Sequence, residues 1–247
     1  MSKDITNIAD NAFLFSLSSD PLRGTNIDVG FAISATSPDA STTIRLMQNS
    51  IKSIIDTYGA TNLRYGVMTF ADRPIILTRF AEKQSPEDLK KIVVTATPSS
   101  GKPSLENMLP EAKKLFEEAG ARPDAKKFLV VILDNKSANE RDDVIKAAKP
   151  LTDTGLWVIP VAIGDNADDE ELQLITPLKR TTVEVPNTGD PEKLAEEITD
   201  KVKKRKYYHR AAKCMFAFDS PMLAMTLTAL MSSNMLFSFS NNPTNQN

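Results

Sequence analysis

The sequence has a single cysteine, Cys214, and a single histidine, His209, among its 247 residues. One cysteine cannot form a disulfide within the chain, and no zinc site can depend on cysteines. This composition fits a reducing compartment, and it equally fits a secreted domain that needs no disulfide. The two residues lie five positions apart in a basic segment with nothing nearby to activate a thiolate, so we do not expect a reactive pair.

An excess of charge of either sign is also missing. The chain carries 30 basic and 32 acidic side chains, for a formal net charge of −2. A balance this close to neutral gives no electrostatic reason to expect nucleic acid as a partner. The hydrophobic fraction of 41% is ordinary for a soluble globular protein, and the length suffices for one domain with tails.

A clear secretory signal is lacking at the start of the chain. Asp4 and Asp10 interrupt the first residues, and the apolar run 12–15 is shorter than the roughly seven residues that a signal peptide needs. We expect residues 1–25 to form a poorly ordered leader. This favours a cytosolic protein, or one whose true start is missing or remodelled.

Apolar runs typical of strands alternate with helical periodicity from Asp28 onward. Such alternation predicts βαβ units, hence an α/β fold: a Rossmann-like, three-layer domain over residues 26–202. Its central sheet is expected to be mostly parallel, with about six strands and helices on both faces. The expected strands are 29–33, 63–70, 74–77, 128–133, 156–163 and 183–185.

Glycine and proline give the expected helix boundaries. Gly59 and Gly120 stand where two long helices should end, and Ser85 is a suitable N-cap for a short helix. A further helix is expected over about 140–149, and Pro150 should stop it or bend its last turn.

Residues 203–247 form a tail of two parts, basic at first and then uncharged. The run from Lys201 to Lys213 is strongly basic, and no charged residue follows Asp219. Residues 221–240 are rich in Met, Leu and Ser and could cross a bilayer by length, yet they are only weakly apolar. We expect a poorly ordered tail and no membrane partner; a tail anchor, which would keep the main domain inside the cell, is the alternative.

Six local phrases resemble, in order, those of the von Willebrand factor A domain family. Strand phrases at 28–34, 63–72, 127–134 and 156–164 are similar to its first, second, fourth and fifth strands. The segments 169–172 and 191–194 match its two closing helices. Together these phrases cover about Asn26 to Val202, and the resemblance implies a non-catalytic domain that binds other proteins.

Members of that family often carry a metal-ion-dependent adhesion site, and the resemblance places it in this chain in degenerate form. Ser34 stands at the first Asp of the family's Asp-x-Ser-x-Ser, Thr36 replaces its first Ser, and Pro38 replaces its second. Pro103 aligns with the family's Thr, beside Ser104, whereas Asp134 is retained. One carboxylate attracts a dication less than two do. We therefore expect no metal and no cofactor. Binding of Mg²⁺ is the disfavoured alternative. It would draw on Asp39 as an additional carboxylate ligand, which the family pattern does not place at this site.

The carboxyl ends of parallel strands meet at one edge of a sheet, where open α/β folds bind their ligands. We expect Ser34, Thr36, Ser104 and Asp134 to gather there as a polar, protein-binding surface.

No enzyme is predicted. The sequence lacks Gly-x-Gly-x-x-Gly after the first strand and Gly-x-x-x-x-Gly-Lys-Ser/Thr anywhere, and His209 lies outside the domain. The interpretation is a secreted adhesive or extracellular-matrix module that binds matrix or adhesion proteins without a metal ion. The alternative is an intracellular, cytoplasmic scaffold protein, tail-anchored or not.

Overall fold

In the computed structural model, the described residues are 25–118, 120–176, 182–186 and 188–217. Residues 1–24 of the expected leader and the uncharged part of the tail lie outside them. A compact unit of the chain ends at Val202.

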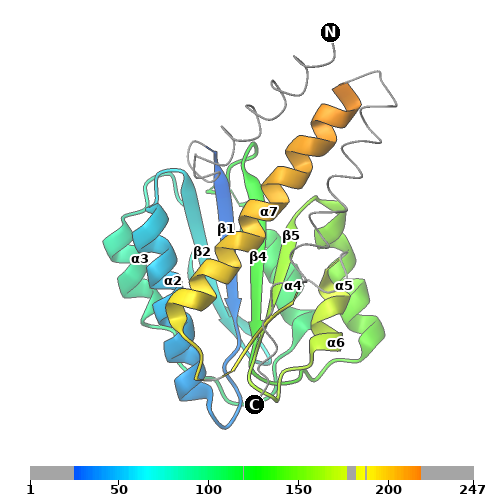
Figure 1. Cartoon of the computed structure of the whole chain (residues 1–247). Helices are drawn as coiled ribbons and strands as arrows, with labels where there is room; N and C mark the ends of the chain where they lie inside the picture. Colours follow the sequence, from blue (N-terminus) through cyan, green and yellow to red (C-terminus); the bar gives the residue numbers. More distant parts are fainter. Residues whose placement is uncertain (1–24, 119, 177–181, 187, 218–247) are drawn as a thin grey trace, which may run out of the picture. The chain divides into compact units, whose positions relative to one another are not determined.

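A six-stranded sheet with the order β3-β2-β1-β4-β5-β6 forms the centre of this unit (Figure 1). All neighbouring strands are parallel except β3, which runs antiparallel to β2 at the sheet edge. This confirms the predicted Rossmann-like α/β fold. The strands are β1 (Ile27–Ile33), β2 (Leu63–Phe70), β3 (Pro74–Thr78), β4 (Lys126–Leu133), β5 (Trp157–Ile163) and β6 (Val183–Val185).

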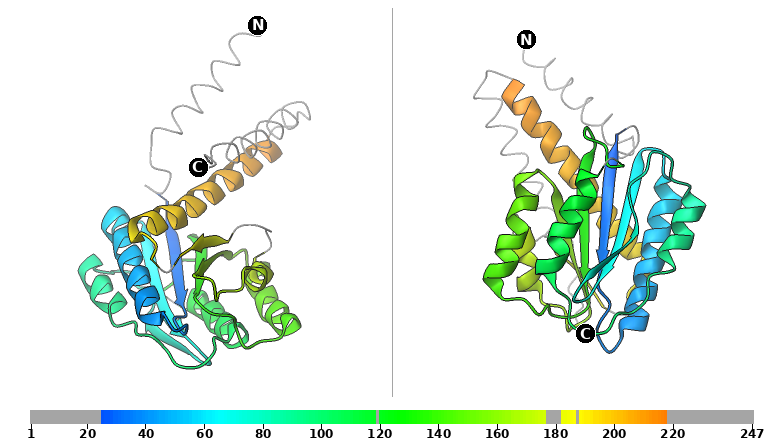
Figure 2. Two further views of the ribbon diagram at one scale, coloured as in Figure 1. Left: turned by 60° about the horizontal axis from the view of Figure 1, so that its bottom comes forward. Right: turned by 180° about the vertical axis from the view of Figure 1, so that it is seen from behind.

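Helices cover both faces of the sheet and give the domain its three layers (Figures 1 and 2). One apolar core lies between the sheet and α2 (Ala40–Tyr58), α3 (Pro86–Val93) and the first part of α7 (Pro191–Ala217). The other lies under α4 (Leu105–Glu117), α5 (Arg141–Asp153), α6 (Asp169–Leu172) and the 3₁₀ turn Gln173–Ile175.

Strand β1 shows why the sheet needs two covering layers. All seven of its residues are buried. Phe31 and Ile33 enter the first core while Ala32, pointing the opposite way, enters the second. A strand in this position is apolar along nearly its whole length, which is the pattern that made it recognisable in the sequence.

Two glycines opposite each other on β1 and β2 let α4 approach the sheet closely. Gly30 and Gly66 are register partners. A Cβ on Gly30 would lie 2.9 Å from Cζ of Phe116, and one on Gly66 would lie 2.8 Å from Cδ2 of Leu115. The missing side chains thus form the recess that receives the end of α4.

The structure corrects the expected ends of two helices. Helix α5 does not stop at Pro150 but continues to Asp153, with the proline inside it. Pro150 is exposed, so water can satisfy the Lys146 carbonyl that loses its helical donor, while Leu151 just beyond is buried in the second core. Helix α4 ends at Glu117, before the predicted Gly120.

Other expected boundaries hold. Gly59 ends α2 with a φ of 65°, and the Ser85 side chain accepts a hydrogen bond from the backbone of Asp88 at the start of α3. In the part of the chain that the structure describes, no helix is both long and apolar enough to cross a membrane.

Candidate functional site

The carboxyl edge of the parallel strands brings together the loops that follow β1 and β4 and the loop that leads into α4. Ser34 directly follows β1 and donates its backbone N–H to Ile132 O of β4 at 2.9 Å. Asp134 directly follows β4 and is 1% exposed. This edge is where we expected the ligand-binding residues.

Asp134 accepts three hydrogen bonds from the β1–α2 loop. Its Oδ1 accepts the Thr36 backbone N–H at 2.8 Å. Its Oδ2 accepts both the backbone N–H of Ser37, at 3.2 Å, and the Ser37 hydroxyl, at 2.8 Å. Charge-assisted bonds of this kind offset the cost of burying a carboxylate, so Asp134 fastens the loop to the end of β4.

None of the hydroxyl groups predicted for the site has a hydrogen bond to Asp134 among the described residues. Thr36 reaches Asp134 through its backbone, and neither the Thr36 nor the Ser34 hydroxyl, both buried, has a hydrogen-bond partner among the described residues. The Ser104 hydroxyl caps α4 by accepting the Asn107 backbone N–H at 3.2 Å. The structure therefore joins Thr36 to Asp134 directly and uses Ser104 to start a helix.

Backbone hydrogen bonds tie the neighbouring loops to one another. Ser99 N donates to Ala35 O at 2.9 Å, linking the loop before α4 to the loop after β1. Ala138 N donates to Pro103 O at 2.8 Å, linking the loop after β4 to the same segment. A set of loops held by mutual hydrogen bonds presents its outer surface in one defined shape.

A second buried carboxylate supports the β4–α5 loop. Glu171 in α6 is 7% exposed; its Oε2 accepts the backbone N–H of Ser137 at 3.0 Å, and its Oε1 accepts the Ser137 hydroxyl. Sequence reasoning missed both residues, as it missed Ser37. Glu171 ends the acidic run 168–171, which by itself is typical of a solvated helix start.

An ion pair also links the β4–α5 loop to the start of α6. Lys136 Nζ lies 2.9 Å from Asp168 Oδ2, while Asp168 Oδ1 caps α6 by accepting the Glu171 backbone N–H at 3.1 Å. The Lys136 ammonium beside it, aided by backbone hydrogen bonds, holds the pKa of Asp168 below its usual value. The lowered pKa means that the ionised form of Asp168, which lies at the N-terminus of α6, persists to lower pH than that of an unpaired aspartate.

Asp134 has few acceptor positions left for a divalent cation. A carboxylate offers about four acceptor positions, and N–H and O–H donors already use three of those on Asp134. Serine stands at position 34, where the family pattern has its first Asp, and Asp39 is exposed at the start of α2. Within the described ranges, no three His, Cys, Asp or Glu side chains gather in a way that could hold a metal ion.

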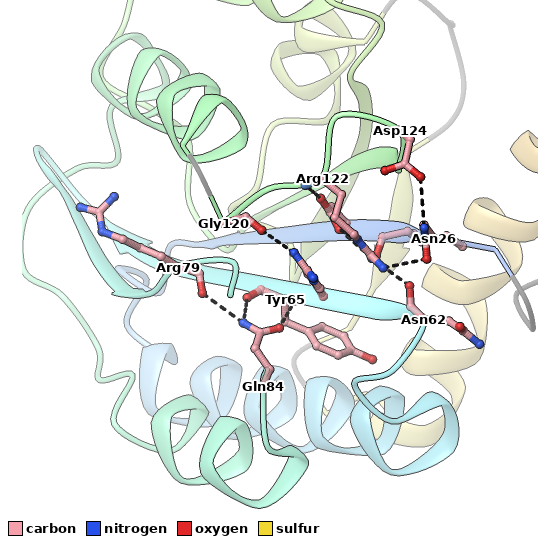
Figure 3. Close-up of polar contacts among 11 residues, drawn as sticks. Asn26, Asn62, Tyr65, Arg79, Gln84, Gly120, Arg122 and Asp124 are labelled. Carbon is pink, nitrogen blue, oxygen red and sulfur yellow. Dashed lines mark hydrogen bonds and ion pairs between the residues drawn. The ribbon is translucent and has the colours of Figure 1, made fainter. Parts of the chain in front are cut away.

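The amino-terminal edge of the sheet holds a buried ion pair (Figure 3). Asp28 in β1 is fully buried, and its Oδ1 accepts from Arg122 Nε at 2.9 Å and from Arg122 Nη2 at 2.7 Å. The Arg122 backbone N–H donates to Asp28 Oδ2 at 2.7 Å, and Nη2 also reaches Asn62 O at 2.9 Å. This cluster joins β1 to the chain before β4 and lies at the edge opposite Asp134.

The sequence is similar to a known domain family and to a chain of collagen VI. A family model described as the von Willebrand factor type A domain matches residues 28–200. The collagen alpha-5(VI) chain of Mus musculus is 28% identical over 132 residues, which are 52% of this chain and 5% of that one. This chain therefore spans a small part of its curated relative.

Two solved structures show the same fold. Proximal thread matrix protein 1 from the mussel byssus, with a zinc-occupied MIDAS motif, has a TM-score of 0.61 at 21% identity over 74% of this chain and 46% of that one. Manganese-loaded TRAP protein of Plasmodium vivax has a TM-score of 0.57 at 14% identity over 70% and 72%. At these identities the likeness establishes the architecture alone.

Proposed function

The chain belongs to the von Willebrand factor type A domain family, and on this premise we propose that it is a non-catalytic, extracellular adhesion or matrix module that binds another protein without a metal ion. Its relatives include a collagen chain and a thread matrix protein, so a role in binding matrix proteins is the reading that the homology favours.

The hydrogen bonds that Asp134 accepts are the observation that supports binding without a metal ion. In this chain the retained carboxylate receives three donors from Thr36 and Ser37. A cation could bind Asp134 only through the one acceptor position that remains, or by displacing N–H and O–H groups that would then be buried without acceptors, at a cost of about 1–3 kcal/mol each. The zinc and manganese named for two structural relatives are therefore not expected here.

The outer rim of the carboxyl edge is the surface we assign to the protein partner. Asp39, Lys102 and Lys136 are exposed on three different loops, and the loops beneath them are held by hydrogen bonds. Recognition on such a rim would depend on shape and on hydrogen bonds to a surface that needs little reordering, which lowers the entropic cost of binding.

The absence of catalysis is supported by the chemistry of this edge. Asp134 and Glu171 are both engaged as hydrogen-bond acceptors within the fold, which leaves neither carboxylate available as a general base. Any ester or phosphoester turnover that Asp134→Ala abolished without unfolding the protein would contradict this.

The central experiment is binding of the full chain to immobilised matrix proteins, collagens first, in buffers with EDTA and with Mg²⁺, Mn²⁺ or Zn²⁺. We expect the same dissociation constant in every buffer and an unchanged Tm on metal titration. Lys102→Glu should weaken binding, whereas the matched Lys83→Glu, exposed ahead of α3, should not. Binding lost in EDTA, or a Tm raised several degrees by sub-millimolar metal, would disprove metal independence.

The compartment needs its own measurement. Tagged full-length protein expressed in its source cells should be recovered from the medium or the matrix fraction. Recovery from the cytosol would instead favour an intracellular scaffold built on the same domain.

A further inference from the structure

Helix α7 continues in the sequence past the end of the compact unit to which its first part belongs. Its buried apolar residues end at Val202, the compact unit ends at the same residue, and the family match ends at position 200. The helix nevertheless continues to Ala217. The folded domain therefore accounts for the first part of α7 and leaves residues 203–217 without an assigned role.

This extension is the most basic part of the chain. Seven of the thirteen residues from Lys201 to Lys213 are Lys or Arg, and no acidic residue occurs between Asp200 and Asp219. The chain has 30 basic side chains in all, so 23 remain elsewhere against 32 acidic ones. The positive charge is thus concentrated in one helical segment of an otherwise acidic protein. The seven residues are Lys201, Lys203, Lys204, Arg205, Lys206, Arg210 and Lys213.

The positions of these charges around the helix indicate which class of anionic partner they suit. Successive residues of an α-helix are turned by about 100°, so the four consecutive basic positions 203–206 fall on different sides of the axis. A helix that lies on a membrane separates a basic face from an apolar face. A helix that is basic all round suits a flexible linear polyanion that can follow it along its length.

We propose that residues 201–213 bind a linear sulfated polysaccharide. At about 1.5 Å per residue the segment is about 20 Å long, enough to face several sugar residues. Each Lys or Arg that neutralises a sulfate or carboxylate releases condensed counterions, which makes the binding favourable and dependent on salt. The choice of a polysaccharide over nucleic acid rests on the proposed extracellular function.

The test uses heparin as the probe and the full chain as the protein. In the variant K203Q/K204Q/R205Q/K206Q the substituted residues remain good helix formers, and no core residue changes. Its matched control, K83Q/K91Q/K146Q/K193Q, removes four exposed charges from the domain. Circular dichroism is used to check that both variants retain their helix content.

We expect heparin affinity at physiological salt to fall about tenfold in the α7 variant and less than twofold in the control. The slope of log Kd against log salt should become shallower by about three. No heparin binding by the unmodified chain, or an equal loss in both variants, would overturn the proposal.

Two further probes test the class of polyanion. Vesicles of phosphatidylserine and phosphatidylcholine, or duplex DNA, should bind more weakly than heparin at the same salt concentration. Tighter binding to either would show that the partner is not a polysaccharide. Because this assay contains no protein ligand, heparin binding can hold when metal-independent protein binding fails, and the reverse.

Discussion

The hydroxyl of Ser37 donates a 2.8 Å hydrogen bond to Oδ2 of Asp134, across 97 positions of sequence. Both residues are buried. The bond joins the loop after β1 to the end of β4, so it holds the proposed binding edge in shape. Of the positions that the family pattern assigns to metal binding, Thr36 and Asp134 are joined here by a hydrogen bond that belongs to this loop closure.

Substitutions in this closure should cost stability in graded amounts. Ser37→Ala removes one hydrogen bond to a charged acceptor and should lower the free energy of unfolding by about 2 kcal/mol. Asp134→Ala also strands the Thr36 and Ser37 N–H groups and should cost about 3–4 kcal/mol. Urea denaturation measures both. Asp39→Ala, on the exposed start of α2, serves as the control, and a loss there equal to that of Asp134→Ala would contradict the assignment.

The recess at Gly30 predicts a size limit. Gly30→Ala places a Cβ 2.9 Å from Phe116 and should destabilise the domain by about 1–3 kcal/mol. Phe116→Leu makes room, so the double variant should be more stable than the sum of the two single losses implies. A double-mutant cycle measures the coupling. Strictly additive losses would show that the contact between Gly30 and Phe116 is not tight.

The buried ion pair of Asp28 and Arg122 predicts that removing the arginine alone costs more stability than replacing both residues. Arg122→Met leaves the fully buried Asp28 carboxylate without its guanidinium and should cost about 3–5 kcal/mol. Adding Asp28→Val removes the stranded charge and should recover a large part of that loss. Thermal or urea unfolding of the two variants tests this, and no recovery in the double variant would mean that the bonds from Arg122 to Asn62 and Ile27 dominate.

The pair of Lys136 and Asp168 predicts a pH dependence. The pKa of Asp168 is lowered in the folded protein, chiefly by the Lys136 hydrogen bond, so its stabilisation is complete above the usual value of 3.8. That stabilisation is lost as the pH falls through the lowered folded pKa. Lys136→Met should therefore reduce stability at pH 7 only slightly, because the lysine is largely exposed and water and salt screen the pair.

The measurement is the free energy of unfolding of Lys136→Met and of the unmodified protein at pH 7 and below pH 3. The difference between the two proteins should shrink at the lower pH, where Asp168 becomes protonated. Lys146→Met, which breaks an exposed pair within α5, is the matched control and should show a smaller difference at pH 7. A difference for Lys136→Met that grows on acidification would contradict the assigned direction.

Much of the fold could be predicted because its determinants are local. The run 128–133 is apolar throughout since β4 is covered on both faces, and the repeat in α2 follows from one buried helix side. The end of α5 could not be predicted from Pro150, because the effect of a proline depends on surroundings that a local pattern does not contain. Whether its lost hydrogen bond is costly is decided by exposure at that turn and by the anchoring of Leu151 beyond it.

The sequence by itself determined the alternation of strands and helices, the family, and the position of Asp134 at the end of a strand, since all of these depend on residue order and hydrophobic period. The tertiary structure alone decided which groups surround that carboxylate. Ser37, Ser137 and Glu171 are ordinary polar residues in the sequence, and their roles arise because distant loops meet at one edge. Hydrogen bonds between loops depend on distance and direction in space, which neither spacing nor composition encodes.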